Sequence, residues 1–365
     1  MRPETHAQAP LGTLRAAFER TGTPAWIMRV IQAKGLDRAE GFRLQVALTG
    51  DGDRGHRQAT LEALRSGEVD FIDTDWISIG RMREDGDSVS AFHPYGRIMG
   101  GLVVDRRRFS GEGRAVAGPG FSAEPLGWAS QGNRIAETPL GAEAQASRPA
   151  AAFQSHLKAL AGRTIAVVSR FDKTWLLLRA YAVEQGIADP ARTVDLVETG
   201  SKHEALRLLS EGEVDGAILF WHLAAEAVTE EPFELVFDAL NAVESLAGEP
   251  LPTTFFVASD ACLRAQPELF RAFARAFDAA VAAMRADTSV WRQGAGEMAL
   301  NGLAQPLRTA WLRRIGLAWP GQLRRRLDEF SVTLKGYVGA EAMGLDALPE
   351  GTFAQDFFTR TEVAR

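Results

Sequence analysis

The sequence predicts an α/β protein built from two lobes, each with a mainly parallel sheet. Strand and helix patterns alternate along most of the 365 residues, and such alternation is typical of βαβ units. The segment GEVD occurs at 67–70 and again at 212–215, each time after a leucine-bearing helix and with a tryptophan six residues beyond its aspartate. A good helix-to-strand connector could also recur without duplication, but this alternative still implies two lobes of similar build.

Composition and charge exclude several classes of protein. Apolar residues make up 46% and the formal net charge is −6, so a dedicated nucleic-acid binder, which needs a basic face, is not expected. No apolar run approaches the roughly 18 residues that indicate a membrane span. The single cysteine, Cys262, rules out an internal disulfide and a cysteine-based metal site, and the histidines form no metal-binding pair.

The elements expected before residue 110 follow from apolar periodicity and from turn residues. Thr23 suits an N-cap and Pro24 a first helical position, so a helix should start there and end at Gly35. A second helix is expected over 58–67. Alternating or continuous apolar runs predict strands at 14–18, 42–48, 69–74, 89–92 and 102–104.

A break in composition separates the two halves. Between Ser110 and Ala152, 26 of 43 residues are Gly, Pro, Ala or Ser. Such a segment buries too little apolar surface to offset the entropy lost on ordering. We therefore expect 108–159 to be a flexible insertion or linker, in which Trp128 is either a docking anchor or, more in keeping with its surroundings, a stray exposed aromatic residue.

The alternation resumes after the insertion. Strands are expected at 164–168, 194–197, 214–220 and 253–257, and helices at 173–184, ended by Gly186, and around 204–209. From Pro267 onward the pattern is mostly helical. In open parallel sheets, ligands bind beyond the carboxyl ends of the strands. Two lobes facing each other would therefore form a ligand cleft between these ends.

Residues at these strand ends are the candidate ligand contacts. Trp76 and Trp221 could stack on a ligand or lie in the core, and Asp75, Asp172 and Ser201 could bind or simply cap helices. Backbone N–H groups at the helix entry near Asp172 could hold an anion. The full set comprises Thr23, Trp26, Asp75, Trp76, His93, Tyr95, Ser169, Asp172, Lys173, Trp175, Thr199, Ser201, Trp221 and His222.

Five segments carry a resemblance to a known family. They are the helix entry GTPAWIMRVIQAKGL, the GEVD-containing segments ALRSGEVDFIDTDW and EALRLLSEGEVDGAILFW, the strand pair FHPYGRIMGGLVV and the strand–helix unit GRTIAVVSRFDKTWLLLRAYAVEQGI. The sequence resembles the substrate-binding proteins of ABC importers for nitrate, sulfonate, taurine and thiamine precursors (NMT1-like). The resemblance implies a type II periplasmic-binding-protein fold and a small-molecule ligand held by hinge closure of the lobes.

The resemblance also implies a domain plan and a partner. Lobe 1 would comprise 1–107 and 251–365, and lobe 2 would comprise 160–250. An ABC transporter permease would receive the ligand, with no cofactor and only peripheral contact with the membrane. The resemblance places the protein in the periplasm, but residues 1–10 are polar and no apolar core of a signal peptide follows them. A cytoplasmic ligand sensor of the same fold is the alternative.

An enzyme is the third interpretation. By resemblance, this fold also includes sulfinate-cleaving enzymes with a nucleophilic cysteine in the first strand–helix loop, and pyrimidine synthases with a cysteine-rich motif. Here that loop, 22–26, has no thiol, and the chain has no GxSxG or Walker motif. We therefore expect binding rather than catalysis. A sulfonate, an aminopyrimidine-like compound and a metal chelate all remain candidate ligands.

Overall fold

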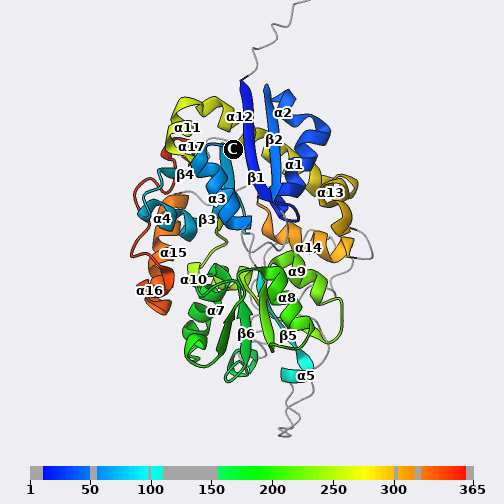
Figure 1. Ribbon diagram of the computed structural model, residues 1–365, viewed down its shortest axis with the longest axis vertical. Helices are drawn as coiled ribbons and strands as arrows, with labels where there is room; N and C mark the ends of the chain where they lie inside the picture. Colours follow the sequence, from blue (N-terminus) through cyan, green and yellow to red (C-terminus); the bar gives the residue numbers. More distant parts are fainter. Residues whose placement is uncertain are drawn as a thin grey trace, which may run out of the picture.

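The computed structural model describes residues 11–49, 56–97, 100–109, 155–299, 303–316 and 322–358. These residues form two five-stranded sheets, one above the other in Figure 1. The first sheet has the spatial order β2 (Phe42–Thr49), β1 (Gly12–Glu19), β3 (Phe71–Asp75), β10 (Thr254–Ser259) and β4 (Val89–Gly96). Strand β1 is parallel to β2 and β3, whereas β10 is antiparallel to β3 and β4.

The second sheet repeats this arrangement. Its spatial order is β7 (Asp195–Glu198), β6 (Thr164–Val167), β8 (Gly216–Leu219), β5 (Gly101–Asp105) and β9 (Phe233–Asp238). Strand β6 is parallel to β7 and β8, and β5 is antiparallel to β8 and β9. Each sheet therefore receives its fourth strand from the part of the chain that builds the other.

The exchange of β5 and β10 corrects one detail of the domain plan. Residues 101–105 were assigned to lobe 1, but they pair with β8 and β9 in the second sheet. The chain thus passes between the sheets before Gly101 rather than near 107. A Cβ atom on Gly100 would lie 1.6 Å from the carbonyl oxygen of Leu219, so only glycine fits at this passage.

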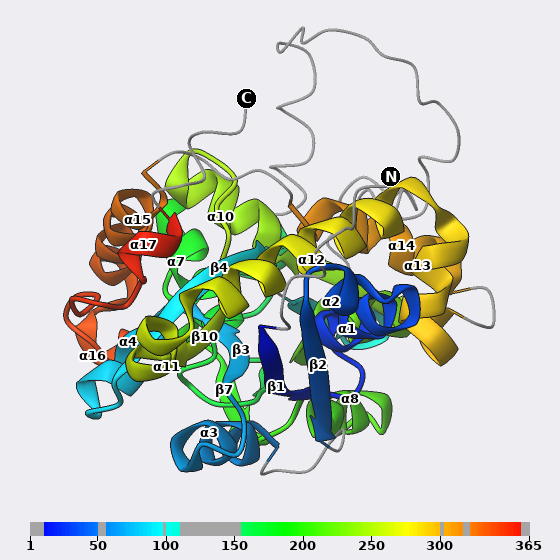
Figure 2. The same cartoon turned by 90° about the horizontal axis from the view of Figure 1, so that it is seen from above.

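Helices cover both faces of the first sheet (Figure 2), and helices such as α8 (Lys202–Ser210) and α9 (Trp221–Ala227) pack against the second. Those in the first half of the chain are α1 (Thr23–Lys34), α2 (Leu36–Ala39), α3 (His56–Ser66), α4 (Trp76–Glu84) and α5 (Arg106–Phe109). Those associated with the second sheet are α7 (Lys173–Glu184), α8, α9 and α10 (Ala239–Ala247). The last part of the chain adds α11 (Asp260–Ala265), α12 (Pro267–Ala286), α13 (Thr288–Ala295), α14 (Ala304–Arg314), α15 (Leu323–Val338), α16 (Ala340–Met343) and α17 (Gln355–Phe358).

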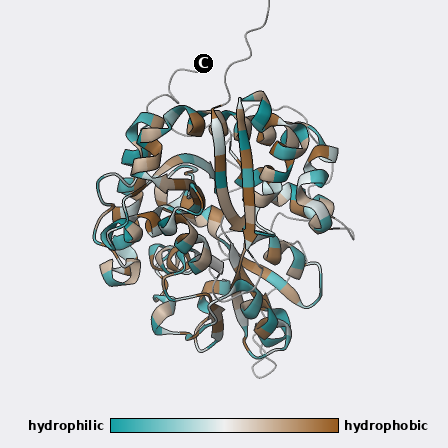
Figure 3. Ribbon diagram, turned by 45° about the horizontal axis from the view of Figure 1, so that its top comes forward, coloured by the Kyte–Doolittle hydropathy of each residue, from teal (hydrophilic) through white to brown (hydrophobic). Residues whose placement is uncertain are grey.

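The core lies on both faces of the sheets. Helices α1, α12 and α13 pack together over one face of the first sheet, where Phe71, Phe92, Phe256 and Phe273 contact one another. The C-terminal helix α15 packs against α7 and α10, so the end of the chain covers helices of the second sheet as well. Figure 3 shows the hydrophobic colour gathered in strands and in the inward faces of the helices. Among the described residues, no helix meets the length and apolarity that a membrane span requires.

Local signals in the sequence explain most of the element boundaries. Gly35 ends α1 in the left-handed conformation with φ 66°. The side-chain oxygens of Asp75, Asp172 and Ser201 cap α4, α7 and α8, which is the alternative to ligand binding that the sequence left open for them. Thr23 was expected to be an N-cap but is the first residue of α1, because the chain is already helical there and Gly22 takes the cap position. The predicted insertion at 108–159, with Trp128, lies almost wholly outside the described residues.

Candidate functional site

A cavity of about 150 Å³ opens between the two sheets. It lies where the carboxyl ends of β1, β3, β6 and β8 face each other, together with the end of β4 and the start of β10. The described residues that line it are Glu19, Gly22, Thr23, Pro24, Thr60, Asp73, Thr74, Asp75, Tyr95, Gly100, Asp172, Lys173, Thr174, Lys202, Phe220, Trp221, His222 and Thr254. Seven of the fourteen predicted site residues belong to this set: Thr23, Asp75, Tyr95, Asp172, Lys173, Trp221 and His222.

The wall formed by the first sheet carries carboxylates at strand ends. The hydroxyl of Tyr95 on β4 donates a 2.7 Å hydrogen bond to Asp73 Oδ2 on β3. Burial, followed by the charge of Asp73, raises the pKa of Tyr95 well above its usual value, so the phenol stays protonated. Asp75 accepts from the backbone N–H and from the hydroxyl of Ser78. The cap and the phenol thus hold two acidic side chains in place at one edge of the cavity.

The wall formed by the second sheet contains a buried ion pair. Lys202 Nζ at the start of α8 lies 2.6 Å from Asp172 Oδ2 at the start of α7, and the ammonium group also lies over the ring of Phe220. Burial raises the pKa of Asp172, but Lys202 and the backbone N–H of Thr174 lower it by more, so the net shift is downward. Asp172 is therefore ionised at neutral pH, and the pair rigidly joins two helix starts.

Three cavity-lining residues have buried polar atoms without a hydrogen-bond partner in the described part of the chain. They are Thr23 Oγ1, Trp221 Nε1 and His222 Nε2. The three residues are 1%, 1% and 3% exposed, respectively. Burial lowers the pKa of His222 to about 4, so its imidazole is neutral near pH 7. Most buried polar atoms in proteins have a partner, and a group of exceptions at one cavity calls for an explanation.

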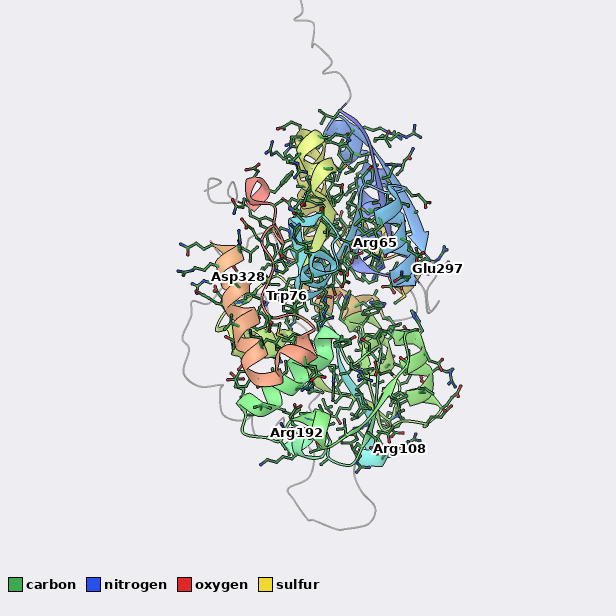
Figure 4. All side chains as sticks on the ribbon, turned by 60° about the vertical axis from the view of Figure 1, so that its left-hand side comes forward. Arg65, Trp76, Arg108, Arg192, Glu297 and Asp328 are labelled. Carbon is green, nitrogen blue, oxygen red and sulfur yellow. The ribbon has the colours of Figure 1, made fainter. Side chains whose placement is uncertain are left out.

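The structure places three predicted tryptophans away from the cavity. Trp76 lies inside the molecule beside α15 (Figure 4), stacked on Phe330, and its indole N–H donates to Ser331 Oγ at 2.9 Å. Trp26 is buried between Trp221 and Trp291, and Trp175 is in the core cluster around α7. The core alternative therefore holds for Trp76, and Trp26 and Trp175, which were expected to contact the ligand, also lie in the core.

Four further predicted residues lie near the cavity without lining it. The ring of His93 stacks on Phe256, as that of Tyr95 does, and its Nε2 lies 3.2 Å from Asp278 Oδ1. The hydroxyls of Ser169 and Ser201 accept backbone N–H bonds within their own turns, and that of Thr199 donates to the carbonyl oxygens of Val167 and Ser201.

Sequence reasoning missed several lining residues, although a signal was present for some. Glu19 is the last residue of β1 and Thr74 stands next to the end of β3, so the rule about carboxyl ends of strands applies to both. Lys202 follows the predicted cap Ser201, but nothing local shows that it reaches Asp172. Thr254 begins β10, an antiparallel strand whose amino end lies at the same edge.

Among the described residues, neither the cysteine nor a metal-binding cluster is found at the cavity. Cys262 lies in α11, is not among the residues that line the cavity, and has a pKa that is raised by burial. Within the same residues, no group of three or more His, Cys, Asp or Glu side chains is placed to hold a metal ion.

Comparisons with known proteins agree with this architecture. The family described as NMT1/THI5 like matches residues 143–289. The chain matches none of the curated proteins. Among solved structures, the periplasmic aliphatic sulphonate binding protein SsuA from Escherichia coli is similar, with a TM-score of 0.62, 12% identity and coverage of 96% of this chain and 99% of that one.

Two more solved structures have the same overall shape. The alkanesulfonate-binding protein SsuA from Xanthomonas axonopodis pv. citri, bound to MOPS, has a TM-score of 0.61 at 14% identity, covering 96% of this chain and 99% of that one. A Candida albicans protein described as having the generic periplasmic binding protein fold has a TM-score of 0.55 at 11% identity, covering 97% and 94%. The resemblance to the NMT1/THI5-like family is thereby confirmed over residues 143–289, and the fold of the chain is that of the periplasmic binding proteins.

Proposed function

We propose that this protein is the solute receptor of an ABC importer, which captures one small organic molecule in the cleft between its two sheets. One observation carries the proposal: residues from both sheets line one cavity, and three of them have buried polar atoms without partners. A ligand that occupied the cavity would satisfy these atoms and would contact both lobes at once. Binding there would favour a closed arrangement of the lobes.

The two chain passages between the sheets supply the proposed hinge. The carbonyl oxygen of Gly96, at the end of β4, accepts from the backbone N–H of Thr253 at 3.0 Å and from the hydroxyl of Thr254 at 2.8 Å. These bonds tie the two passages together beside Thr254, which also lines the cavity. Small rotations at adjacent passages would move one sheet relative to the other without breaking either core.

A thermal-shift screen tests the receptor function. The panel contains nitrate, sulfonates, aminopyrimidines, organic amines and metal chelates, each far above a micromolar dissociation constant. A ligand at about 100 times its dissociation constant stabilises the folded state by roughly 2.7 kcal/mol. Small-angle scattering then checks that the ligand lowers the radius of gyration. If no compound stabilised the protein, or if binding left the scattering unchanged, the receptor proposal would fail.

A matched pair of threonines locates the binding site. Thr23 and Thr253 both have a buried hydroxyl without a partner among the described residues, but only Thr23 lines the cavity. Substitution by valine keeps the shape of each side chain. We expect Thr23→Val to weaken binding of the ligand found in the screen and Thr253→Val to leave it unchanged. Equal effects would place the ligand elsewhere.

The location and the partner follow from the receptor function. A receptor for an importer acts on the outer side of the cytoplasmic membrane and delivers its ligand to a permease, so we infer a periplasmic location. Osmotic-shock fractionation of cells that express the native gene tests this. Release of the protein with periplasmic markers would support the receptor, whereas retention with cytoplasmic markers would favour the ligand sensor of the same fold.

A further inference from the structure

Carboxylates outnumber ammonium groups in the cleft. Among the described lining residues, the charged side chains are the carboxylates of Glu19, Asp73, Asp75 and Asp172 and the ammonium groups of Lys173 and Lys202. Asp172 and Lys202 form an ion pair at 2.6 Å and contribute no net charge. The neutral imidazole of His222 adds none either. Three carboxylates therefore face one ammonium group across the cavity.

The excess of negative charge is confined to one wall. Glu19 ends β1, while Asp73 and Asp75 end β3, the strand that pairs with β1. The hydroxyl of Tyr95 donates to Asp73, and a hydrogen bond from a neutral donor does not remove the charge of a carboxylate. In a cleft with low-dielectric walls, carboxylates of one sign concentrate the field and attract a cation. An anionic ligand would instead add to the charge already present.

The partnerless polar atoms are a second and independent indication of the ligand. The indole N–H of Trp221 can only donate, so its partner must be an acceptor. Thr23 Oγ1 and His222 Nε2 are neutral and can each take part in one further bond. Leaving such groups buried and unbonded is unfavourable, because they lose their hydrogen bonds to water without gaining others. A ligand that meets them must carry a hydrogen-bond acceptor away from its charged group.

The size of the cavity limits the ligand. Its volume is about 150 Å³, and cavities of roughly this size accommodate one aromatic ring. The aromatic residues Tyr95, Phe220 and Trp221 line it and favour a flat molecule.

From charge, polar atoms and size together, we propose that the cleft selects a small organic cation of about one ring that also carries a hydrogen-bond acceptor. The N–H groups of the cation face the carboxylates at the ends of β1 and β3, and the acceptor faces the indole of Trp221. The inference rests on the proposed receptor function and specifies the substrate class of the same cleft. It departs from the sulfonates named for the similar solved structures, which share 14% identity or less with this chain.

Three probes of nearly equal shape test the charge. Benzamidine is a cation, benzamide is neutral and benzoate is an anion, and their affinities are measured by calorimetry on the full chain at pH 7.5 and low salt. We expect benzamidine to bind at least about tenfold more tightly than benzamide, with benzoate weakest, because attraction to charged groups decides such comparisons. Tighter binding of benzoate, equal binding of the three, or no binding of benzamidine at 10 mM would overturn the inference.

A matched pair of aspartates tests the position of the cation. Asp73→Asn keeps an oxygen for the Tyr95 hydroxyl and removes the charge. Asp195→Asn removes a charge from an exposed position on β7, outside the cavity. We expect Asp73→Asn to weaken benzamidine about tenfold and to leave benzamide unchanged, whereas Asp195→Asn changes neither. Equal loss in both variants would reduce the effect to long-range charge and would overturn the placement of the cation.

A ring nitrogen tests the acceptor. Pyridine-4-carboxamidine differs from benzamidine by one acceptor atom opposite the amidine. We expect it to bind more tightly than benzamidine to the wild-type protein and no better to Trp221→Phe, which lacks the indole N–H. An unchanged preference in Trp221→Phe would show that the acceptor does not meet Trp221.

The thermal-shift screen distinguishes a failure of the cation preference from a failure of the receptor function. If the three probes contradicted the cation preference while a sulfonate or another solute stabilised the protein, the receptor function would stand and only this inference would fall. If the screen and the probes both gave no binding, the two proposals would fall together.

Discussion

The two copies of GEVD fold in the same way but lead into different surroundings. Gly67 and Gly212 both adopt left-handed conformations, with φ of 75° and 71°. Asp70 Oδ2 accepts from the backbone N–H of Arg15 on β1 at 2.7 Å, and Asp215 Oδ2 accepts from that of Thr164 on β6 at 2.9 Å. In each sheet, the aspartate ties the entry of the third strand to the first strand. The repeated sequence therefore encodes the same connector twice.

The tryptophans that follow the two connectors differ in role. Trp76 begins α4 under an aspartate cap and gives its N–H to Ser331 in α15. Trp221 begins α9, where Phe220 takes the cap position without a side-chain bond, and its N–H has no partner among the described residues. The first copy ends in the core and the second ends at the cleft. Local sequence sets the connector, and the packing of distant helices decides what each tryptophan does.

Removal of the buried charge behind Trp221 has the largest expected effect. The Arg314 guanidinium lies 5.8 Å from the Trp221 ring centre, and its Nη2 donates to Asp238 Oδ1 at 2.8 Å. Arg314→Met leaves Asp238 buried without this charge, so we expect the free energy of unfolding to fall by about 3–5 kcal/mol. Urea unfolding at pH 7 measures the change.

The neighbouring arginine is the control for this substitution. Arg313 is more exposed and lies 3.7 Å from the other oxygen of Asp238. Arg313→Met should change the stability by less than about 1 kcal/mol. Similar losses in Arg313→Met and Arg314→Met would show that any nearby arginine compensates the charge of Asp238. The Arg314 guanidinium behind Trp221 would then have no particular role in stability.

The residue after each tryptophan gives a pH-dependent difference between the copies. Ile77 follows Trp76, whereas His222 follows Trp221 and has its pKa lowered by burial from 6.5 to about 4. Between these values the unfolded chain binds one proton more than the folded protein. The free energy of unfolding therefore falls as the pH decreases through this window, by up to about 1.4 kcal/mol per pH unit.

His222→Ile makes the second copy like the first and removes this dependence. Urea unfolding of wild type and variant at pH 8, 7, 6 and 5 measures it. The stability difference between the two proteins should stay constant from pH 8 to 7 and shift in favour of the variant below about 6.5. Parallel curves down to pH 5 would contradict a buried, neutral imidazole.

The two connector aspartates should contribute about equally. Asp70→Ala and Asp215→Ala each leave a backbone N–H of a central strand without its partner, which costs about 1–3 kcal/mol. The Arg15 side chain also pairs with Asp70, but it is 43% exposed, so Arg15→Ala should cost less than about 1 kcal/mol. Chemical denaturation compares the three variants. A loss in Arg15→Ala as large as that in Asp70→Ala would assign the role to the ion pair instead of the backbone bond.

The parts of the molecule that local chemistry determines could be predicted from the sequence. Periodicity and turn residues located β1, α1, α7 and both connectors, and the rule about strand ends pointed to the edge at which the cavity lies. Contacts between residues that are far apart in the sequence could not be predicted. Nothing near Trp76 announces Ser331, which is 255 residues away, and nothing near Gly101 shows that β5 pairs in the second sheet. Residues whose role depends on distant partners, such as Trp76, could be assigned only from their position at the end of a strand.

The mildest substitution compares the two indoles directly. Trp76→Phe removes a donor from Ser331 Oγ, so we expect a loss of about 1–2 kcal/mol from the broken bond and the smaller ring. Trp221→Phe also shrinks a buried ring, but it removes an N–H that has no partner among the described residues, and the desolvation cost that disappears offsets the lost contacts. The loss in Trp221→Phe should therefore be smaller than in Trp76→Phe by roughly 1 kcal/mol, as measured by urea unfolding without ligand.

A bound ligand changes this comparison. A ligand that satisfies the indole N–H stabilises the wild-type protein more than Trp221→Phe. The difference between the two losses of stability should therefore shrink or reverse when the ligand is present. Equal losses without ligand would mean that the N–H of Trp221 is already bonded in the folded protein. The two copies would then differ only in the residue that caps the helix after the connector.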